Sequence, residues 1–265
     1  MGQEETFREM EVKSNDLVVR KISLSDLWQA LREGFNDFQA KPTHIVFLCV
    51  VYPLFALLLT LFLVGERLVY LAFPVVSGFT LIGPVVSVAL FEMSRRREHG
   101  LDVTWRAAFD FVHTYSFAPI LALSIVMMLL YVAWLYMAEL LYFGLFGAGP
   151  PVSISAFVNE VFTTRHGWAL IFYGTILGFI FALVTLSISV FAFPLLLDRP
   201  VSSITAVTTS IRAVAANPLT MAVWGIIVVG LLAIGSVLFL IGLAVVLPVL
   251  GHSTWHLYRK VVVEP

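Results

Sequence analysis

Long apolar runs separated by short polar segments dominate the hydropathy pattern of this 265-residue chain. The runs lie at about 44–64, 68–93, 117–142, 168–197 and 219–258. A helix needs about 20 mainly apolar residues to cross a ~30 Å hydrocarbon layer, and each run reaches that length. The last run would measure ~60 Å as one helix, so we expect it to fold back near Gly235 and Ser236 or near Gly242. The pattern therefore predicts an all-α membrane protein with six transmembrane helices.

Three polar segments share a second pattern, in which apolar residues recur at helical spacing. They are WQALREGFNDFQAKP (28–42), WRAAFDFVHTYSFAP (105–119) and ITAVTTSIRAVAANP (204–218). In each segment apolar residues recur at i, i+3 and i+7, alanine holds the third place and proline the fifteenth. This spacing predicts amphipathic helices at the membrane interface. The shared prolines suit the first turn of the helix that follows, and they are Pro42, Pro119 and Pro218.

These segments indicate three pseudo-repeats, each built from an interfacial helix and a transmembrane hairpin. The expected units follow a polar cytoplasmic tail, 1–22, expected to be disordered, and together form a single membrane domain over 23–265. Their boundaries lie at about 23–100, 101–200 and 201–260. The second helix of each hairpin carries its own proline, at Pro84, Pro194 and Pro248. The alternative is that any interfacial helix converges on such spacing, which explains the apolar positions but not the shared alanine and proline.

Two of the hairpins end alike. PVVSVALFEMSR (84–95) and PVLGHSTWHLYR (248–259) have the same length from proline to arginine, which makes Glu92 and His256 equivalent in position. If the repeats pack around one axis, we expect a polar contact or an ion pair between these two side chains. The second unit departs from the pattern, because PLLLDRP (194–200) reaches its charge sooner.

Composition agrees with a membrane protein, since 60% of residues are hydrophobic and 12% are charged, against about a quarter charged in soluble domains. The net charge of -1 favours no nucleic-acid partner. Cys49 is the only cysteine, so no intramolecular disulfide is expected.

The distribution of lysine and arginine predicts the orientation. With six spans, 14 of these residues fall on one face and two, Arg67 and Arg165, on the other. Because such residues collect on the cytoplasmic side, both termini are expected in the cytoplasm. Five spans would carry Arg259 and Lys260 to the wrong face. On the outer face, Ser155 to Thr164 is expected to form a short interfacial helix.

Few residues in this sequence carry candidate chemistry. His252 and His256 are one helical turn apart, a spacing at which imidazoles can bind a metal, with Glu92 as the one obvious helper. The simpler interpretation places both histidines at the cytoplasmic interface beside Trp255 and Tyr258. The chain shows no phosphate-binding glycine loop and no Ser-His-Asp constellation that the sequence places at one depth, so we expect no enzyme and no cofactor.

Charged and small residues have structural interpretations. Cytoplasmic anchoring and contact with anionic lipid are expected of five cations, Arg95, Arg96, Arg97, Arg259 and Lys260. Glu92 is three and four residues from Arg95 and Arg96 and can pair with either. GFTLIGP (78–84) predicts a kink within a span, and Gly174 with Gly178 predicts a close helix approach.

Three stretches carry a resemblance to a known family. LPVLGHSTWHLYRKV (247–261), NPLTMAVW (217–224) and SDLWQALREGFNDF (25–38) resemble the bacterial integral-membrane family called domain of unknown function 2189. The resemblance extends over most of the chain from about residue 18. It implies an inner-membrane protein of Gram-negative bacteria and implies no activity.

The leading hypothesis is a non-catalytic membrane component, an accessory, assembly or scaffold protein that contacts the lipid bilayer and other membrane proteins. The alternatives are a small transporter or lipid-handling permease, and a metal- or haem-binding accessory protein of a respiratory complex.

Overall fold

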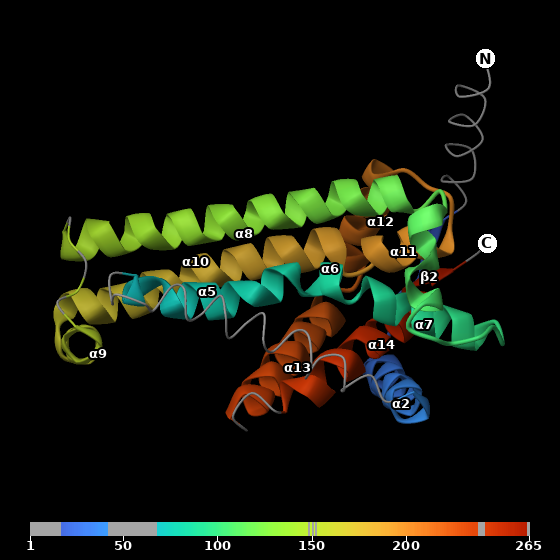
Figure 1. Ribbon diagram of the computed structural model, residues 1–265, viewed down its shortest axis with the longest axis horizontal. Helices are drawn as coiled ribbons and strands as arrows, with labels where there is room; N and C mark the ends of the chain where they lie inside the picture. Colours follow the sequence, from blue (N-terminus) through green and yellow to red (C-terminus); the bar gives the residue numbers. More distant parts are fainter. Residues whose placement is uncertain are drawn as a thin grey trace, which may run out of the picture. The chain divides into compact units, whose positions relative to one another are not determined.

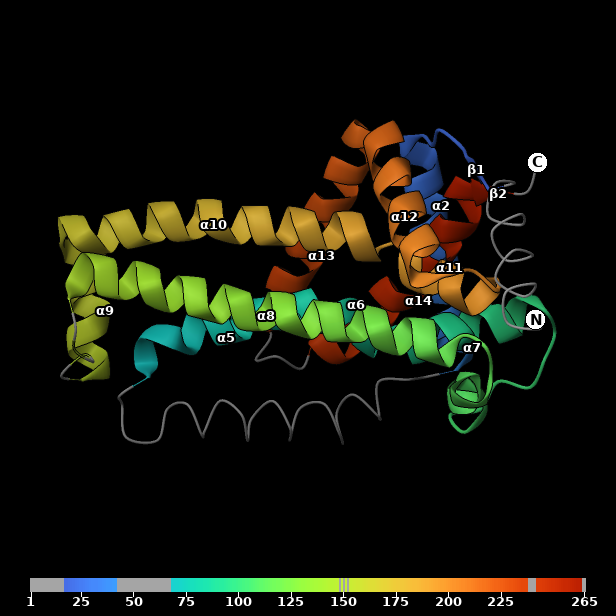
Figure 2. The same ribbon diagram turned by 90° about the horizontal axis from the view of Figure 1, so that it is seen from above.

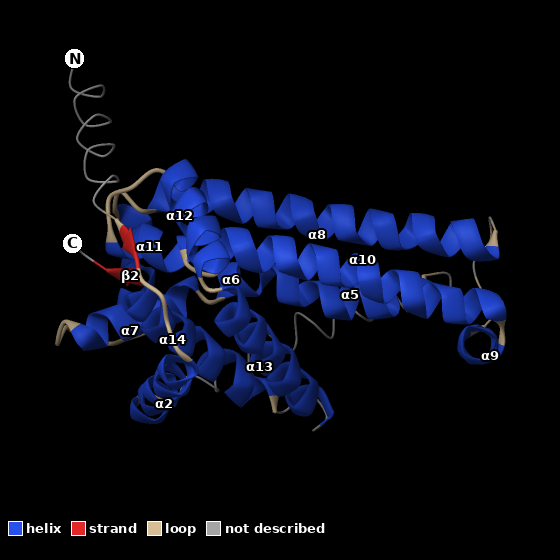
Figure 3. Cartoon of the chain, turned by 180° about the vertical axis from the view of Figure 1, so that it is seen from behind, coloured by secondary structure: helices blue, strands red, loops and turns tan. Residues whose placement is uncertain are grey.

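The computed structural model describes residues 17–41, 68–147, 149, 151, 153–237 and 242–263 (Figure 1). The first predicted span at 44–64, most of the polar tail and Pro42 lie outside the described residues. Almost all of the described chain is helical (Figure 3).

The elements follow one another in this order: β1 (Val18–Val19), α2 (Leu24–Ala40), η2 (Val69–Leu71), α5 (Ala72–Gly78), η3 (Phe79–Ile82), α6 (Gly83–Val86), α7 (Val88–Glu98), η4 (Ala107–His113), α8 (Phe117–Phe146), α9 (Ile154–Thr163), α10 (Arg165–Ser189), α11 (Ala192–Asp198), α12 (Ser203–Ala216), α13 (Pro218–Val237), α14 (Leu243–Val261) and β2 (Val262–Val263).

Four helical stretches of the described chain are long and apolar enough to cross a membrane. They are Val69–Glu98, Phe117–Phe146, Arg165–Asp198 and Pro218–Ser236, which match the second, third and fourth predicted runs and the first half of the last. The prediction of a mainly helical fold with several helices long and apolar enough to cross a membrane is confirmed. Helix α14 is not among the four, because its second half carries histidine, arginine and lysine.

The stretch Val69–Glu98 is interrupted where the sequence predicted a kink. Helix α5 ends at Gly78, a 3-10 turn covers Phe79–Ile82, and α6 begins at Gly83, one residue before Pro84. Gly78 packs directly on α8, since a Cβ atom there would lie 2.6 Å from side-chain atoms of Trp134 and of Tyr131. The interruption is therefore a packed kink between helices.

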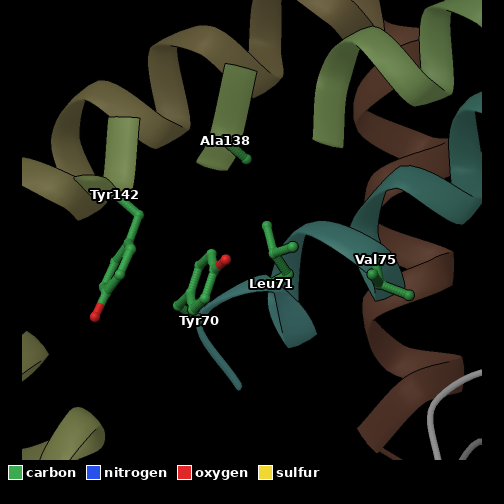
Figure 4. Packing of buried hydrophobic residues seen from close by; sticks show 5 residues of the cluster. All are labelled: Tyr70, Leu71, Val75, Ala138 and Tyr142. Atoms are coloured by element: carbon green, nitrogen blue, oxygen red, sulfur yellow. The ribbon is translucent and has the colours of Figure 1, made fainter. Parts of the chain in front are cut away.

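Contacts divide the chain into two compact units. One unit contains the described parts of 68–83 and 125–185, and its core is a cluster of Tyr70, Leu71, Val75, Ala138 and Tyr142 (Figure 4). The rings of Tyr70 and Tyr142 stack with centroids 4.3 Å apart, and the Tyr70 hydroxyl donates a hydrogen bond to Glu139 at 3.1 Å.

The contact of α10 with α8 and one short helix complete this unit. A Cβ atom at Gly178 would lie 3.4 Å from the Trp134 ring and one at Gly174 would lie 3.8 Å from Leu141, which are ordinary contact distances. The predicted close approach of two helices at this glycine pair is therefore not observed, and α10 meets α8 through long side chains. The predicted outer helix is α9, which Ser153 caps by accepting a hydrogen bond from the amide of Ala156. It lies at the far ends of α8 and α10 in both views (Figure 2).

The other unit contains the described parts of 17–41, 84–124 and 186–263. Its helices α2 and α14 pack against each other, and α7 and α11 pack on α14. A two-residue antiparallel pairing joins β1 to β2, with Val18 opposite Val263 and Val19 opposite Val262. Segments near the two ends of the chain therefore lie side by side.

The predicted fold-back of the last apolar run agrees with a hairpin of α13 and α14. Helix α13 continues through Gly235 and Ser236 to Val237, and α14 starts after Gly242. Gly235 and Gly242 approach closely, since a Cβ atom at Gly242 would lie 2.8 Å from the Gly235 Cα atom. Four of the residues between the two helices lie outside the described chain.

Two of the three predicted amphipathic helices are present, as α2 and α12. The prediction for 105–119 is wrong, because this segment forms the 3-10 helix η4 over Ala107–His113 and α8 begins at Phe117. The segment is rich in aromatic and β-branched residues, which lose side-chain freedom in an α-helix. The shared alanines are nevertheless alike in burial, since Ala30, Ala107 and Ala206 are all at most 8% exposed.

The shared and hairpin prolines fall in different positions. Pro218 is the first residue of α13 and Pro119 lies in the first turn of α8, as the sequence predicts. Of the hairpin prolines, Pro84 lies in α6, Pro194 in α11 and Pro248 inside α14.

Candidate functional site

A buried polar cluster joins α2, α7 and α14 in the compact unit that contains the described parts of 17–41, 84–124 and 186–263. Its central residue is Asp37, which lies on the same face of α2 as Leu27, Ala30 and Gly34. This face is buried, and Asp37 is only 8% exposed. Gly34 permits the close crossing, because a Cβ atom there would clash with the backbone of Ser253 on α14. The small residues of α2 thus bring Asp37 against the polar half of α14.

The Asp37 carboxylate accepts hydrogen bonds from side chains of both neighbouring helices. Its Oδ2 atom accepts from the Ser94 hydroxyl at 2.6 Å and from Nε2 of His256 at 2.8 Å. Its Oδ1 atom accepts from Nη1 of Arg97 at 2.9 Å. A buried carboxylate is stable only when its oxygens are satisfied in this way.

The hydrogen bonds of Asp37 also determine its ionisation. Burial opposes the charged form, but the hydrogen bonds from His256 and Ser94 outweigh burial and hold the pKa of Asp37 below its usual value of 3.8. The carboxylate is therefore charged at neutral pH.

His252 extends the cluster away from Asp37. Its Nδ1 atom lies 2.8 Å from the Ser94 hydroxyl oxygen. Because Ser94 uses its single hydrogen toward Asp37, the Nδ1 atom of His252 must carry the hydrogen and donate it to Ser94. Nε2 of His252 then has a free lone pair, and this buried atom has no hydrogen-bond partner among the described residues.

The structure brings Ser94, His252 and Asp37 together, a Ser-His-Asp group that the sequence does not place at one depth. Their order differs from that of a catalytic triad. Ser94 lies between the histidine and the aspartate and gives its proton to the aspartate, whereas a triad histidine lies between the other two and takes the serine proton. Ser94 and His252 are each 1% exposed, so the hydroxyl is closed to a substrate.

The five cations expected at the cytoplasmic face are all engaged with carboxylates of the chain. Arg95 binds Glu92 through two hydrogen bonds of 2.7 and 2.8 Å, and Arg96 lies 3.3 Å from Asp110. The remaining pairs are Arg97 with Asp37 at 2.9 Å, Arg259 with Glu98 at 3.0 Å and with Asp198 at 3.3 Å, and Lys260 with Glu33 at 3.4 Å. The pairing of Glu92 with Arg95 agrees with their spacing.

Aromatic side chains of α14 complete this polar layer. The indole Nε1 atom of Trp255 donates to Glu98 at 3.0 Å, and the hydroxyl of Tyr258 donates to Asp198 at 2.7 Å. Both side chains are fully buried. Polar atoms of α14 therefore find partners on α2, α7 and α11.

The expected contact between Glu92 and His256 is not observed. Glu92 is held by Arg95 on its own helix, and His256 is held by Asp37 and, at 3.6 Å, by Glu33 of α2. Each side chain has an oppositely charged or hydrogen-bonding neighbour closer than the predicted one.

The described residues offer little support for a metal site. Among them no group of three or more His, Cys, Asp or Glu side chains has the arrangement of metal ligands. Glu92 does not join His252 and His256, and Nε2 of His256 already binds Asp37. What remains is one free imidazole nitrogen, on His252.

The sequence interpretation missed Asp37 and Ser94, although a signal for Asp37 was present. The apolar stripe that predicts the amphipathic helix includes Trp28 and Phe35, which the structure leaves exposed. A second stripe at Leu27, Ala30, Gly34 and Asp37 has the same i, i+3, i+7 spacing and contains two small residues, Ala30 and Gly34. Small residues allow helices of membrane proteins to approach closely, so this stripe indicates a helix contact that would bury Asp37. Ser94 had no comparable signal.

The helices and their internally neutralised polar cluster define an integral membrane protein of the α-helical class. Residues 72–198 match the family described as "Predicted integral membrane protein (DUF2189)". This match confirms the family resemblance found in the sequence, but it covers just under half of the chain and includes none of the three stretches on which the resemblance was based. No curated protein and no solved structure matches the chain.

Proposed function

We propose that this protein is a non-catalytic membrane component, an accessory, assembly or scaffold protein. One observation carries the proposal. The charges of the polar cluster neutralise one another within the chain, and its two groups with potential reactivity, Ser94 and His252, are buried. Such an arrangement fixes the helices against one another, and it leaves neither Ser94 nor His252 facing a substrate.

We further propose six spans with both termini on the cytoplasmic side of a bacterial inner membrane. The pairing of β1 with β2 requires residues 19 and 262 to lie on one side, so the chain between them crosses the membrane an even number of times. Four candidate spans and the apolar run at 44–64 make five, an odd number, so we assign the sixth span to the remainder of the last apolar run, as far as Leu250 in α14. The bias of lysine and arginine supports the cytoplasmic assignment.

Three interfacial elements, one in each unit of an internal repeat, are part of this proposal. All three shared alanines are buried, and Pro119 and Pro218 lie in first helical turns, which supports it. The 3-10 form of η4 is a departure of the second repeat from the common pattern. The hairpin of this repeat departs from the pattern as well.

One alternative has a specific observation in its favour. The free Nε2 atom of His252 is the kind of atom that binds a metal or haem iron, so a metal- or haem-binding accessory protein is the second candidate. The transporter or permease hypothesis receives no comparable support from the described residues.

Purification of the affinity-tagged, full-length protein in mild detergent tests the proposal. We expect co-purifying membrane proteins, together with a colourless and metal-free preparation. A coloured or metal-bearing protein whose signal is lost in His252→Phe would establish the second candidate instead. A monomer that is colourless, free of metal and free of partners would contradict both.

A further inference from the structure

The contacts of α2 with α14 leave one face of this helix uncovered, and we call it the outer face of α2. Large apolar side chains occupy this face, and Trp28 is 67% exposed, Leu24 54% and Phe35 44%. Leu31 and Phe38 lie on the same stripe and are partly buried. Exposed apolar side chains that gather along one helix face mark an interaction site.

The carboxylates of α2 and the cations at and around it differ in whether they are engaged within the chain. Its three carboxylates are engaged within the chain: Asp26 accepts from the amide and hydroxyl of Ser23, Glu33 pairs with Lys260, and Asp37 forms the cluster. The cations at the helix and its ends are exposed, and the ion pairs between described residues include none of them. These cations are Arg20, Lys21, Arg32 and Lys41.

This distribution changes which cations are available to an anionic surface. The five cations that the sequence suggested for lipid contact, including the run Arg95–Arg97, are neutralised by carboxylates of the chain. Arg32, in contrast, borders the apolar stripe one turn after Trp28. An apolar stripe beside exposed cations is the composition of helices that lie in the interface of anionic membranes.

The position of α2 in the chain selects the bilayer as the occupant of this face. The helix ends at Ala40, and the apolar run begins four residues later, at His44. Four residues reach at most about 14 Å, so the end of α2 stays close to the membrane surface if the run spans the membrane. The inference rests on the proposed six-span topology and does not depend on the accessory role.

We propose that the outer face of α2 is the contact of this protein with the anionic lipid surface. Leu24, Trp28 and Phe35 insert among the headgroups, and Arg20, Arg32 and Lys41 bind lipid phosphates. The inner face meanwhile stays locked to α14 through Gly34 and Asp37. The run Arg95–Arg97 acts within the protein.

Spin labels on the full-length protein in lipid vesicles test this orientation. In a Cys49→Ser background, single cysteines replace Trp28 or Phe35 on the outer face, and Gln29 or Asn36 on the polar side as matched controls. In vesicles containing phosphatidylglycerol, we expect labels at 28 and 35 to be relaxed mainly by oxygen, and labels at 29 and 36 mainly by a water-soluble nickel complex. Equal nickel accessibility at all four positions would overturn the proposal.

The charge requirement has its own comparison. Replacing phosphatidylcholine by phosphatidylglycerol should move the label at 35 deeper, and the double variant Arg32→Gln, Lys41→Gln should lose this shift. Arg165→Gln removes an exposed cation of the other unit and should retain the shift. A shift that survives in the double variant would refute lipid binding by these cations. Because labels report depth and not partners, this result is independent of whether other proteins co-purify.

Discussion

At the scale of single residues, the packing of α2 depends on one carboxylate. Asp37 accepts hydrogen bonds from α7 and α14 at once, so removing its charge leaves donors on two helices without their acceptor. Hydrogen bonds to charged groups contribute about 1.5–3 kcal/mol each, and leaving a buried partner unsatisfied costs a similar amount.

We expect Asp37→Asn to lower the free energy of unfolding by about 2–3 kcal/mol at neutral pH. The folded-state pKa of Asp37 lies below its ordinary value of 3.8, so its contribution is present above that pH and is lost as the pH falls through the folded pKa. Thermal unfolding in detergent, followed from neutral to acid pH, should show a smaller loss of stability on acidification in the variant than in the wild type.

The exposed carboxylate of Asp102 supplies the control, since Asp102→Asn should leave both the stability and its pH dependence unchanged. Parallel acid profiles for wild type and Asp37→Asn would show that the carboxylate does not hold the helices together.

Residue-scale features of this protein were predictable only where they followed from local spacing. The Glu92–Arg95 pair lies within one helical turn, so the sequence alone indicates it. The bond between Asp37 and His256 joins residues 219 positions apart, and no local pattern specifies which helix α14 meets. The free histidine nitrogen and the serine between histidine and aspartate follow from that meeting.

At the scale of elements, close helix crossings depend on residues without side chains. Gly34 faces the backbone of Ser253, and Gly251 faces Leu90, so α2 and α7 both approach α14 at small residues. Buried polar atoms reach their partners only because the helices come this close. Shape and polarity are therefore coupled in this part of the protein.

We expect Gly34→Ala to destabilise the protein by about 1–3 kcal/mol, because the added methyl group meets rigid backbone. Thermal unfolding of the purified protein measures the loss. Gly225→Ala in α13 is the matched control, since nothing lies within 4 Å of a Cβ atom there, and it should be neutral or stabilising. Equal stability of the two variants would mean that α2 and α14 do not cross as closely as described.

The sequence predicted two kinds of element well, the long apolar helices and the helices with one apolar and one polar face. The runs that became α8, α10 and α13 are nearly uniformly apolar, and α2 and α12 have a clear stripe. The segment that became η4 has the same spacing, but its aromatic and β-branched residues oppose the α-helix, and Arg96 binds its Ala107 carbonyl and Asp110. Spacing alone therefore overestimated its helical character.

At the scale of the whole molecule, the pairing of β1 with β2 constrains the topology. Val18 and Val263 face each other, so both must be on the same side of the membrane. This constraint is independent of the count of spans and of the distribution of charge.

Single cysteines at Val18 and Val263, in a Cys49→Ser background, test the constraint. We expect both to resist a membrane-impermeant maleimide in intact cells and both to react after permeabilisation. As a reference, a cysteine at Asn159 on the outer helix α9 should react in intact cells. Labelling of only one of the two terminal positions would contradict the strand pairing and the even number of spans.

The contact between α2 and α14 also has a consequence in time. Ribosomes add about 5–20 residues per second, so the 219 residues that separate Asp37 from His256 take roughly 10–45 s to synthesise. Throughout that interval the newly made α2 presents a charged aspartate and an uncovered glycine face with no α14 to receive them. Helix α2 can therefore dock only after α14 has been synthesised, and a chain that stops short of α14 leaves α2 undocked.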